Sequence, residues 1–135
     1  MKIIDRLLED KIHISFEVFP PKTDAGYEKV RSATEQIAGL HPSYISVTYG
    51  AGGGTSKNTA KIASYIRDEL GVESLAHLTC ASSTKAEVQT VIENLKALGI
   101  ENILALRGDI PEGMVFPSED RYHYAYELVE AIRQS

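Results

Sequence analysis

The strongest constraint on the fold is a fourfold alternation of short apolar segments with longer amphipathic ones. The apolar segments are residues 12–20, 44–50, 73–81 and 101–109. The amphipathic segments that follow them are residues 27–40, 56–71, 84–99 and 122–134. Short apolar runs predict buried strands, and helical periodicity predicts α-helices. Because strands joined by helical crossovers lie parallel, the sequence predicts an α/β fold with a parallel sheet.

The ends of the predicted helices carry local signals. Thr84 and Glu87 have the spacing of a capping box at the start of the third helix. Gly71 and Gly99 each follow a helical segment and precede a strand, where a left-handed glycine commonly ends a helix. A short helix around residues 3–8 is expected before the first strand.

Polar residues recur near the strand ends with a period of about thirty. Glu17 and Thr48 are 31 residues apart, and Thr48 and His77 are 29 apart. His77 and Arg107 are 30 apart. This period indicates βα units of the TIM-barrel type. Since a barrel of eight units takes about 250 residues, we expect residues 1–135 to form a single domain of about half a barrel, with four βα units and the leading helix.

Side-chain alternation along a strand predicts which face of the sheet carries polar groups. The face predicted to meet helices carries Ile12, Ile14, Phe16, Val18, Ile45, Val47, Leu104 and Leu106. The opposite face is predicted to carry Glu17, Thr48, His77, Arg107 and Asp109. These polar residues lie towards the carboxyl ends of the strands, where barrels and open α/β sheets build their sites.

Glu17 interrupts an apolar strand just before two prolines, in ISFEVFPPK. A carboxyl group that faces a partly desolvated cavity has its charged form disfavoured, which raises its pKa towards the range of a general acid. We therefore interpret Glu17 as a candidate acid. The alternative is an interior salt bridge, for example with Arg107.

Asp109 ends the segment LALRGD, in which Gly108 allows the backbone to approach a ligand closely. Two carboxylates on neighbouring strand ends can divide acid and electrostatic roles, so Asp109 is the second catalytic candidate. The alternative is that Asp109 only caps the turn into the following loop.

The segment YGAGGGTS, residues 49–56, leads from a strand into a helix. Its backbone amides and the helix N-terminus are suited to a phosphate group, although it matches neither a Walker A motif nor a dinucleotide fingerprint. A tight βα turn is the alternative. A phosphate-handling aldolase or isomerase barrel would use such a loop, but the strand ends supply no Schiff-base lysine.

Composition excludes several classes of partner. The net charge of -5 argues against nucleic acid, which is bound by concentrated Lys and Arg. No apolar run reaches the roughly 18 residues of a membrane span. His77 and the single cysteine, Cys80, are too isolated to form a metal site, so we expect no metal. With one cysteine and no recognisable signal peptide, the sequence predicts a cytoplasmic protein.

Four ordered motifs, SFEVFPPK, VTYGAGGG, AHLTC and LALRGD, resemble the N-terminal half of the methylenetetrahydrofolate reductase family. The resemblance runs from about Ile12 to Ile132. It implies a TIM-barrel flavoenzyme of one-carbon metabolism and methionine biosynthesis, with FAD as cofactor and NADH or NADPH as electron donor. The implied reaction reduces 5,10-methylenetetrahydrofolate, the folate substrate, to 5-methyltetrahydrofolate.

The resemblance also implies roles for individual residues. Glu17 matches the acid that protonates a folate nitrogen, and Asp109 matches a carboxylate near the flavin and folate that favours the cationic intermediate. Thr48 matches a residue near the nicotinamide-bearing ligand. The implied contacts to flavin are Tyr49, Ala51, His77, Arg107, Gly108, Tyr124 and Ala125.

The resemblance covers four βα units where a barrel has eight. Three interpretations follow for a four-unit chain: a fragment of an active reductase, a homo-oligomer in which two half-barrels pair edge to edge, or a noncatalytic half-barrel that binds flavin or another anion or is only a remnant. Unpaired edge strands favour association.

Overall fold

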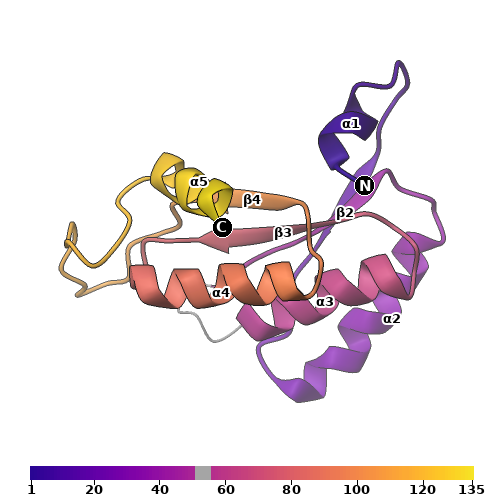
Figure 1. Cartoon of the computed structure of the whole chain (residues 1–135). Helices are drawn as coiled ribbons and strands as arrows, with labels where there is room; N and C mark the ends of the chain where they lie inside the picture. Colours follow the sequence, from indigo (N-terminus) through magenta and orange to yellow (C-terminus); the bar gives the residue numbers. More distant parts are fainter. Residues whose placement is uncertain (51–55) are drawn as a thin grey trace.

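The computed structural model describes residues 1–50 and 56–135. Helices and strands alternate along the chain (Figure 1). The elements are α1 (Ile3–Leu7), β1 (Ser15–Val18), the 3-10 helix η1 (Asp24–Gly26), α2 (Tyr27–Ala38), β2 (Tyr44–Val47), α3 (Ser56–Asp68), β3 (Ser74–Thr79), α4 (Lys85–Ala97), β4 (Ile103–Leu106) and α5 (Ala125–Gln134).

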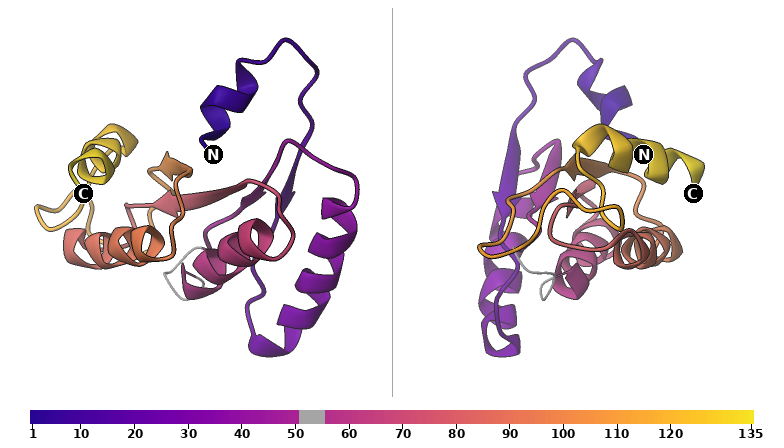
Figure 2. Two further views of the ribbon diagram at one scale, coloured as in Figure 1. Left: turned by 45° about the vertical axis from the view of Figure 1, so that its right-hand side comes forward. Right: turned by 90° about the vertical axis from the view of Figure 1, so that its left-hand side faces the viewer.

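The four strands form one parallel sheet in the order β1-β2-β3-β4. The predicted α/β class with parallel βα units is therefore confirmed. Helices α2 to α5 lie in an arc outside the curved sheet (Figure 2, left), which is consistent with about half of a TIM-type barrel. The sheet is not closed, since within the described residues β1 and β4 are each paired on one side only.

The capping signals read from the sequence are confirmed. The side chain of Thr84 accepts a hydrogen bond from the Glu87 backbone N–H, and the Glu87 carboxylate accepts one from the Thr84 N–H. Gly71 and Gly99 have φ of +66° and +71°, in the left-handed region. Satisfying these helix-end groups fixes where the chain leaves each helix for the next strand.

The last helix begins at Ala125, later than the predicted start at residue 122. The Glu127 carboxylate accepts hydrogen bonds from the backbone N–H groups of His123 and Tyr124, both at 2.7 Å. Tyr124 is extended, with φ of −137° and ψ of 155°. These bonds end the loop and start the helix, so the aromatic residues before Ala125 belong to the loop.

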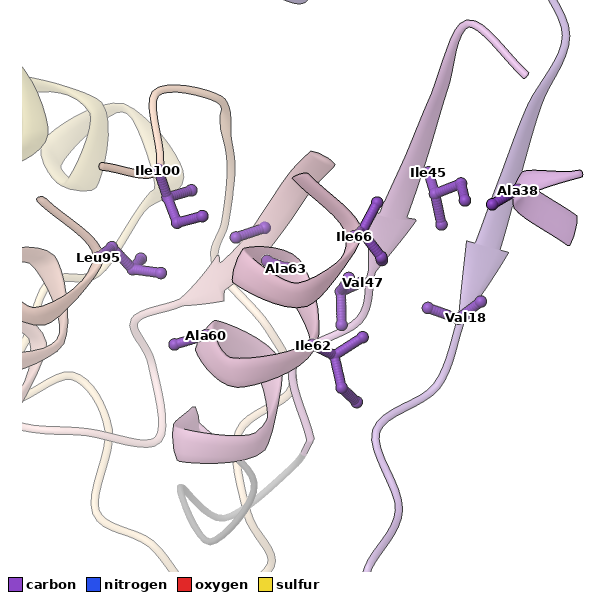
Figure 3. Packing of buried hydrophobic residues seen from close by; sticks show 11 residues of the cluster. Val18, Ala38, Ile45, Val47, Ala60, Ile62, Ala63, Ile66, Leu95 and Ile100 are labelled. Carbon is purple, nitrogen blue, oxygen red and sulfur yellow. The ribbon is translucent and has the colours of Figure 1, made fainter. Parts of the chain in front are cut away.

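The larger part of the core lies between the sheet and α3. Ile45 and Val47 of β2 face Ile62, Ala63 and Ile66 of α3 (Figure 3). All five side chains are almost completely buried. Burying a Val or Ile side chain contributes about 1.5–3 kcal/mol, so this contact holds β2 and α3, the second βα unit, together.

A second core cluster joins β3 to the later helices. It consists of Leu78 and Cys80 from β3 and its end, Val88 and Ile92 from α4, and Leu128 from α5. The alternate residues of β3 thus point to helices on the same side as those of β2. This cluster anchors the two C-terminal helices to the sheet.

Helix α1 is attached to the amino-terminal ends of β3 and β4. Ile3 is buried, and its backbone N–H donates to Oδ1 of Asn102 at 2.8 Å. The side-chain amide of Asn102 donates to the carbonyl of Met1 at 3.1 Å. The Met1 ammonium group pairs with Glu73 and Glu101. The leading helix predicted from the sequence is therefore present, at the end of the sheet opposite the strand carboxyl ends.

The predicted assignment of faces in the fourth strand is wrong. Leu104 pairs with His77 and Leu106 with Thr79, which places both leucines on the face opposite the helices. Ile103 and Ala105 contact the helix-side core instead. All four residues of β4 are apolar, so alternation carries no information about its faces, and pairing with β3 decides them.

The predicted helix-side face of the first strand is only partly covered. The strand begins at Ser15, and the preceding Ile12 and Ile14 are exposed. Val18 is buried and Phe16 is half-buried. Coverage increases towards the carboxyl end of β1 because α2 packs there.

Candidate functional site

The face of the sheet opposite the helices, called here the open face, brings together side chains from three neighbouring strands. Glu17 on β1 pairs in register with Ser46 on β2, and Ser46 pairs with Leu75 on β3. His77 lies two residues beyond Leu75 and shares its face. Glu17, Ser46 and His77 therefore form a polar cluster near the carboxyl ends of the strands.

Glu17 and His77, both predicted site residues, lie within reach of each other. Oε2 of Glu17 is 3.6 Å from Nε2 of His77. The Ser46 hydroxyl donates to the same oxygen at 3.4 Å. Ser46 was not among the predicted site residues, although its alternation with Ile45 and Val47 is sufficient to place it on this face.

Burial and charge act on His77 in opposite directions. Only 11% of its side chain is exposed, against 48% for Glu17. Desolvation lowers the pKa of His77, and the neighbouring Glu17 carboxylate raises it by less. A histidine with a lowered pKa is mainly neutral at neutral pH, so this imidazole is suited to hydrogen bonding more than to a lasting ion pair.

The alternative partner considered for Glu17, Arg107, does not contact it. The Arg107 Nε donates to the carbonyl of Gly108 at 3.2 Å. The Arg107 carbonyl accepts from the backbone N–H groups of Cys80 and Ala81, which extends the β3–β4 ladder past the strand ends. The partner of Glu17 in the sheet is therefore His77.

Gly108 has a structural reason to be glycine. Its φ is +77°, and a Cβ atom on it would lie 2.9 Å from Cβ of Thr79. The close approach predicted here is therefore made to the neighbouring strand β3. This contact needs both a left-handed conformation and the absence of a side chain.

Asp109 lies on the exposed chain just beyond Gly108. Among the residues that the structure describes, its carboxylate makes no hydrogen bond or ion pair, so the alternative of a turn cap has no support. The carboxylate is exposed to solvent at the end of β4, separate from the contacts of Glu17.

Thr48 ties the end of β2 to its surroundings. Its backbone N–H donates to the carbonyl of Val18 at 3.0 Å, and its carbonyl accepts from the Thr59 hydroxyl at 2.9 Å. Tyr49 is half-buried against the core cluster of Leu78. Ala51 and most of the glycine-rich loop proposed to receive a phosphate lie in 51–55, outside the described residues.

Tyr124 and Ala125 lie at the start of α5. Tyr124 is exposed, and its ring stacks on that of Tyr126 with centroids 5.9 Å apart. The Tyr124 carbonyl faces Sγ of Cys80 at 4.0 Å. The contact with Cys80 attaches the start of α5 to the helix side of β3, and none of these contacts reaches the Glu17 cluster.

The described residues show no sign of a metal site, a reactive thiol on the open face or a membrane span. In the two described segments, no group of three or more His, Cys, Asp or Glu side chains is arranged for a metal ion. Cys80 is fully buried in the helix-side core, on the opposite face from His77. No helix in these segments combines the length and the apolar character needed to cross a membrane.

A groove of about 570 Å³ lies between α3 and α4, on the helix side of the sheet. Its apolar lining includes Ala60, Val91 and Leu98, and Lys57 and Asn94 are among its polar residues. It contains none of the residues predicted for the site. The chemistry on the open face is therefore separate from this groove.

Comparison with known proteins identifies the family. A family model described as methylenetetrahydrofolate reductase matches residues 2–135. Methylenetetrahydrofolate reductase (NADH) 1 of Zea mays is 37% identical in an alignment 139 residues long, gaps included, that covers 98% of this chain and 23% of that protein. The 5,10-methylenetetrahydrofolate reductase of Escherichia coli is 35% identical over 127 residues, 94% of this chain and 42% of that protein.

The chain thus spans between 23% and 42% of the length of these relatives. The match extends through all four βα units and through α5. It includes the strands that carry Glu17, Ser46 and His77. The chain belongs to the methylenetetrahydrofolate reductase family.

Proposed function

We propose that this chain forms the N-terminal part of a catalytic barrel that reduces 5,10-methylenetetrahydrofolate to 5-methyltetrahydrofolate. The observation that carries the proposal is the Glu17 carboxyl group on the open face, supported by Ser46 and His77 at the strand carboxyl ends. Family membership supports the reaction, and the position of the cluster supports Glu17 as its acid.

Glu17 is the proposed proton donor. Protonation of a folate nitrogen weakens its bond to the bridging methylene carbon, so the bridge opens to a cation that can accept hydride. A carboxyl group that is half-exposed can reach a substrate and still regain its proton from solvent. Asp109, exposed at the end of β4, is the proposed carboxylate that stabilises the positive charge.

The described residues fit the flavin that the family implies. Leu104 and Leu106 present half-exposed apolar surface on the open face, which suits a largely apolar ring system. Beyond β4, the Arg107 guanidinium makes one hydrogen bond among the described residues, leaving further N–H donors for an anionic group. When bound, FAD would supply the hydride.

Several residues are proposed to orient the cofactor. They are Thr48, Tyr49, Ala51, His77, Arg107, Gly108, Asp109, Tyr124 and Ala125. The name of the maize relative specifies NADH, which supports NADH as the donor that reduces the flavin. NADPH is the alternative, and comparing the rates with the two nucleotides decides between them.

The open edges of the sheet support a further part of the proposal. Within the described residues, β1 and β4 each lack a neighbour on one side, and Ile14 and Phe19 beside β1 are exposed. We propose that further strands complete the barrel, either from a longer chain such as the relatives have or from a second copy. Light scattering coupled to size exclusion measures whether the 135-residue chain is a monomer or an oligomer.

The test is to purify the chain, add FAD, and measure bound flavin and folate reduction together. Glu17→Gln is expected to keep flavin binding and to lower the rate by roughly 10²- to 10⁴-fold. Glu130→Gln, at an exposed position on α5, is the matched control and should leave the rate unchanged. Flavin binding without turnover would favour the noncatalytic alternative, and absence of both would contradict the proposal for this chain.

A further inference from the structure

The two oxygens of the Glu17 carboxyl group have different surroundings. Oε2 accepts the Ser46 hydroxyl at 3.4 Å and lies 3.6 Å from Nε2 of His77. No hydrogen bond or ion pair from residues 1–50 or 56–135 reaches Oε1. Among the described residues, Oε2 therefore has two polar neighbours on the sheet and Oε1 has none.

The Ser46 hydroxyl has two possible hydrogen-bond acceptors. Its Oγ is 3.4 Å from Oε2 of Glu17 and 3.5 Å from the carbonyl oxygen of Phe16. A hydroxyl has one proton to donate, and a hydrogen bond to an ionised acceptor is about twice as strong as one to a neutral acceptor. The hydroxyl is therefore expected to favour Glu17 when the carboxyl group is ionised, and to turn to Phe16 when it is protonated.

We propose that Ser46 and His77 are positioning residues for Glu17, which hold Oε2 against the sheet so that Oε1 is the oxygen that exchanges a proton with substrate. The proton exchange at Oε1 rests on the proposed function. The structural content of the inference, a carboxylate held by a hydroxyl and an imidazole, can be measured without any cofactor.

The position of Ser46 makes it suited to this role. It is largely buried at 7% exposure and lies on β2, between the strands that carry Glu17 and His77. Its backbone is held on both sides by the ladders to β1 and β3. A short side chain on such a strand has few positions available, so the hydroxyl stays close to the carboxyl group.

The other titratable groups near the cluster are few. On β1 and β3, Glu17 and His77 are the titratable groups on the open face. On β2, Tyr44 lies on the same face, two residues before Ser46. Arg107 and Asp109 follow β4, where Arg107 bonds to Gly108. Among the described residues, His77 is thus the ionisable partner that contacts Glu17.

The test is ¹³C NMR of the Glu17 carboxyl carbon at one fixed pH, on the full chain without cofactor. Because a hydrogen-bond donor changes the electronic surroundings of the carboxyl group that it contacts, Ser46→Ala should shift this resonance relative to wild type. Ser46→Thr keeps the hydroxyl and should restore the resonance. Ser43→Ala removes a hydroxyl that bonds to His13 instead, and should leave the Glu17 resonance unchanged.

A reciprocal measurement tests the imidazole. Glu17→Gln removes the carboxylate that raises the pKa of His77, so the His77 titration should move to lower pH. An unchanged Glu17 resonance in folded Ser46→Ala, or an unchanged His77 midpoint in Glu17→Gln, would overturn the inference. Circular dichroism identifies variants that fail to fold. If Ser46→Ala is one of them, the His77 midpoint in Glu17→Gln decides.

The NMR measurements and the activity assay fail independently. If the Glu17 resonance and the His77 midpoint shift as expected but Glu17→Gln does not lower turnover, then the positioning contacts exist and the proposed function is wrong. If Glu17→Gln abolishes turnover but neither of them shifts, Glu17 acts without support from Ser46 and His77, and this inference alone is wrong.

Discussion

The helix-covered face and the open face of the sheet are built on different principles. The covered face carries Ile45, Val47, Ala76 and Leu78, all completely buried against helices. The open face carries polar groups of several kinds, together with leucines of β4 that stay more than a third exposed. Packing therefore determines residue choice on the covered face, whereas the open face is free to hold reactive groups.

The comparison is tested most strongly by two leucines on adjacent strands. Leu78 faces the helices with no exposed surface, and Leu104 faces the open side at 39% exposure. Leu78→Ala should lower the free energy of unfolding by about 2–5 kcal/mol, because it leaves a cavity in the core. Leu104→Ala should cost roughly half as much or less. Urea denaturation measures both, and equal losses would remove the distinction between the faces.

A smaller effect is expected from a matched pair of glycines. Gly108 and Gly113 both have φ of +77°, but only at Gly108 would a Cβ meet a neighbour, at 2.9 Å from Cβ of Thr79. Gly113→Ala should cost about 1–2 kcal/mol through backbone strain alone. Gly108→Ala should cost roughly 1–3 kcal/mol more, because the methyl group overlaps Thr79. Equal thermal stability of the two variants would show that β3 and the β4 end can separate freely.

The smallest effect concerns the buried imidazole of the open face. Burial lowers the pKa of His77 in the folded chain, so between the folded value and the ordinary value near 6.5 the unfolded chain binds more protons. Stability from this group is therefore complete above pH about 6.5 and decreases as the pH falls through that window. Between pH 7.5 and pH 5, the free energy of unfolding should fall more steeply in wild type than in His77→Gln. Parallel curves for the two proteins would contradict this role of His77.

The sequence was most informative where one chemical signal had one structural outcome. The capping box at Thr84 and the left-handed glycines at 71 and 99 were predicted because backbone hydrogen bonding at helix ends requires them. The period of thirty predicted that Glu17 and His77 would share an edge, and the structure places them 3.6 Å apart.

The sequence was least informative where a strand is apolar at every position, or where a residue belongs to no recognisable motif. The run ILAL of β4 is apolar at every position, so only its pairing with His77 and Thr79 shows which leucines face outward. Alternation places Ser46 on the open face, but a serine within a strand gives no signal of a role. Its role depends on the distance to Oε2 of Glu17, which arises only when β1 and β2 pair in register.

The attachment of α1 has a consequence for the order in which the chain acquires structure. The Ile3 backbone bonds to Asn102, 99 residues later and just before β4, so this contact cannot form until the chain has been synthesised as far as Asn102. Contacts of such long sequence separation carry a large loop-closure cost and form late in folding. We therefore expect the first helix of the chain to be among the last to dock, and its amides to gain protection from hydrogen exchange after those of β2 and β3.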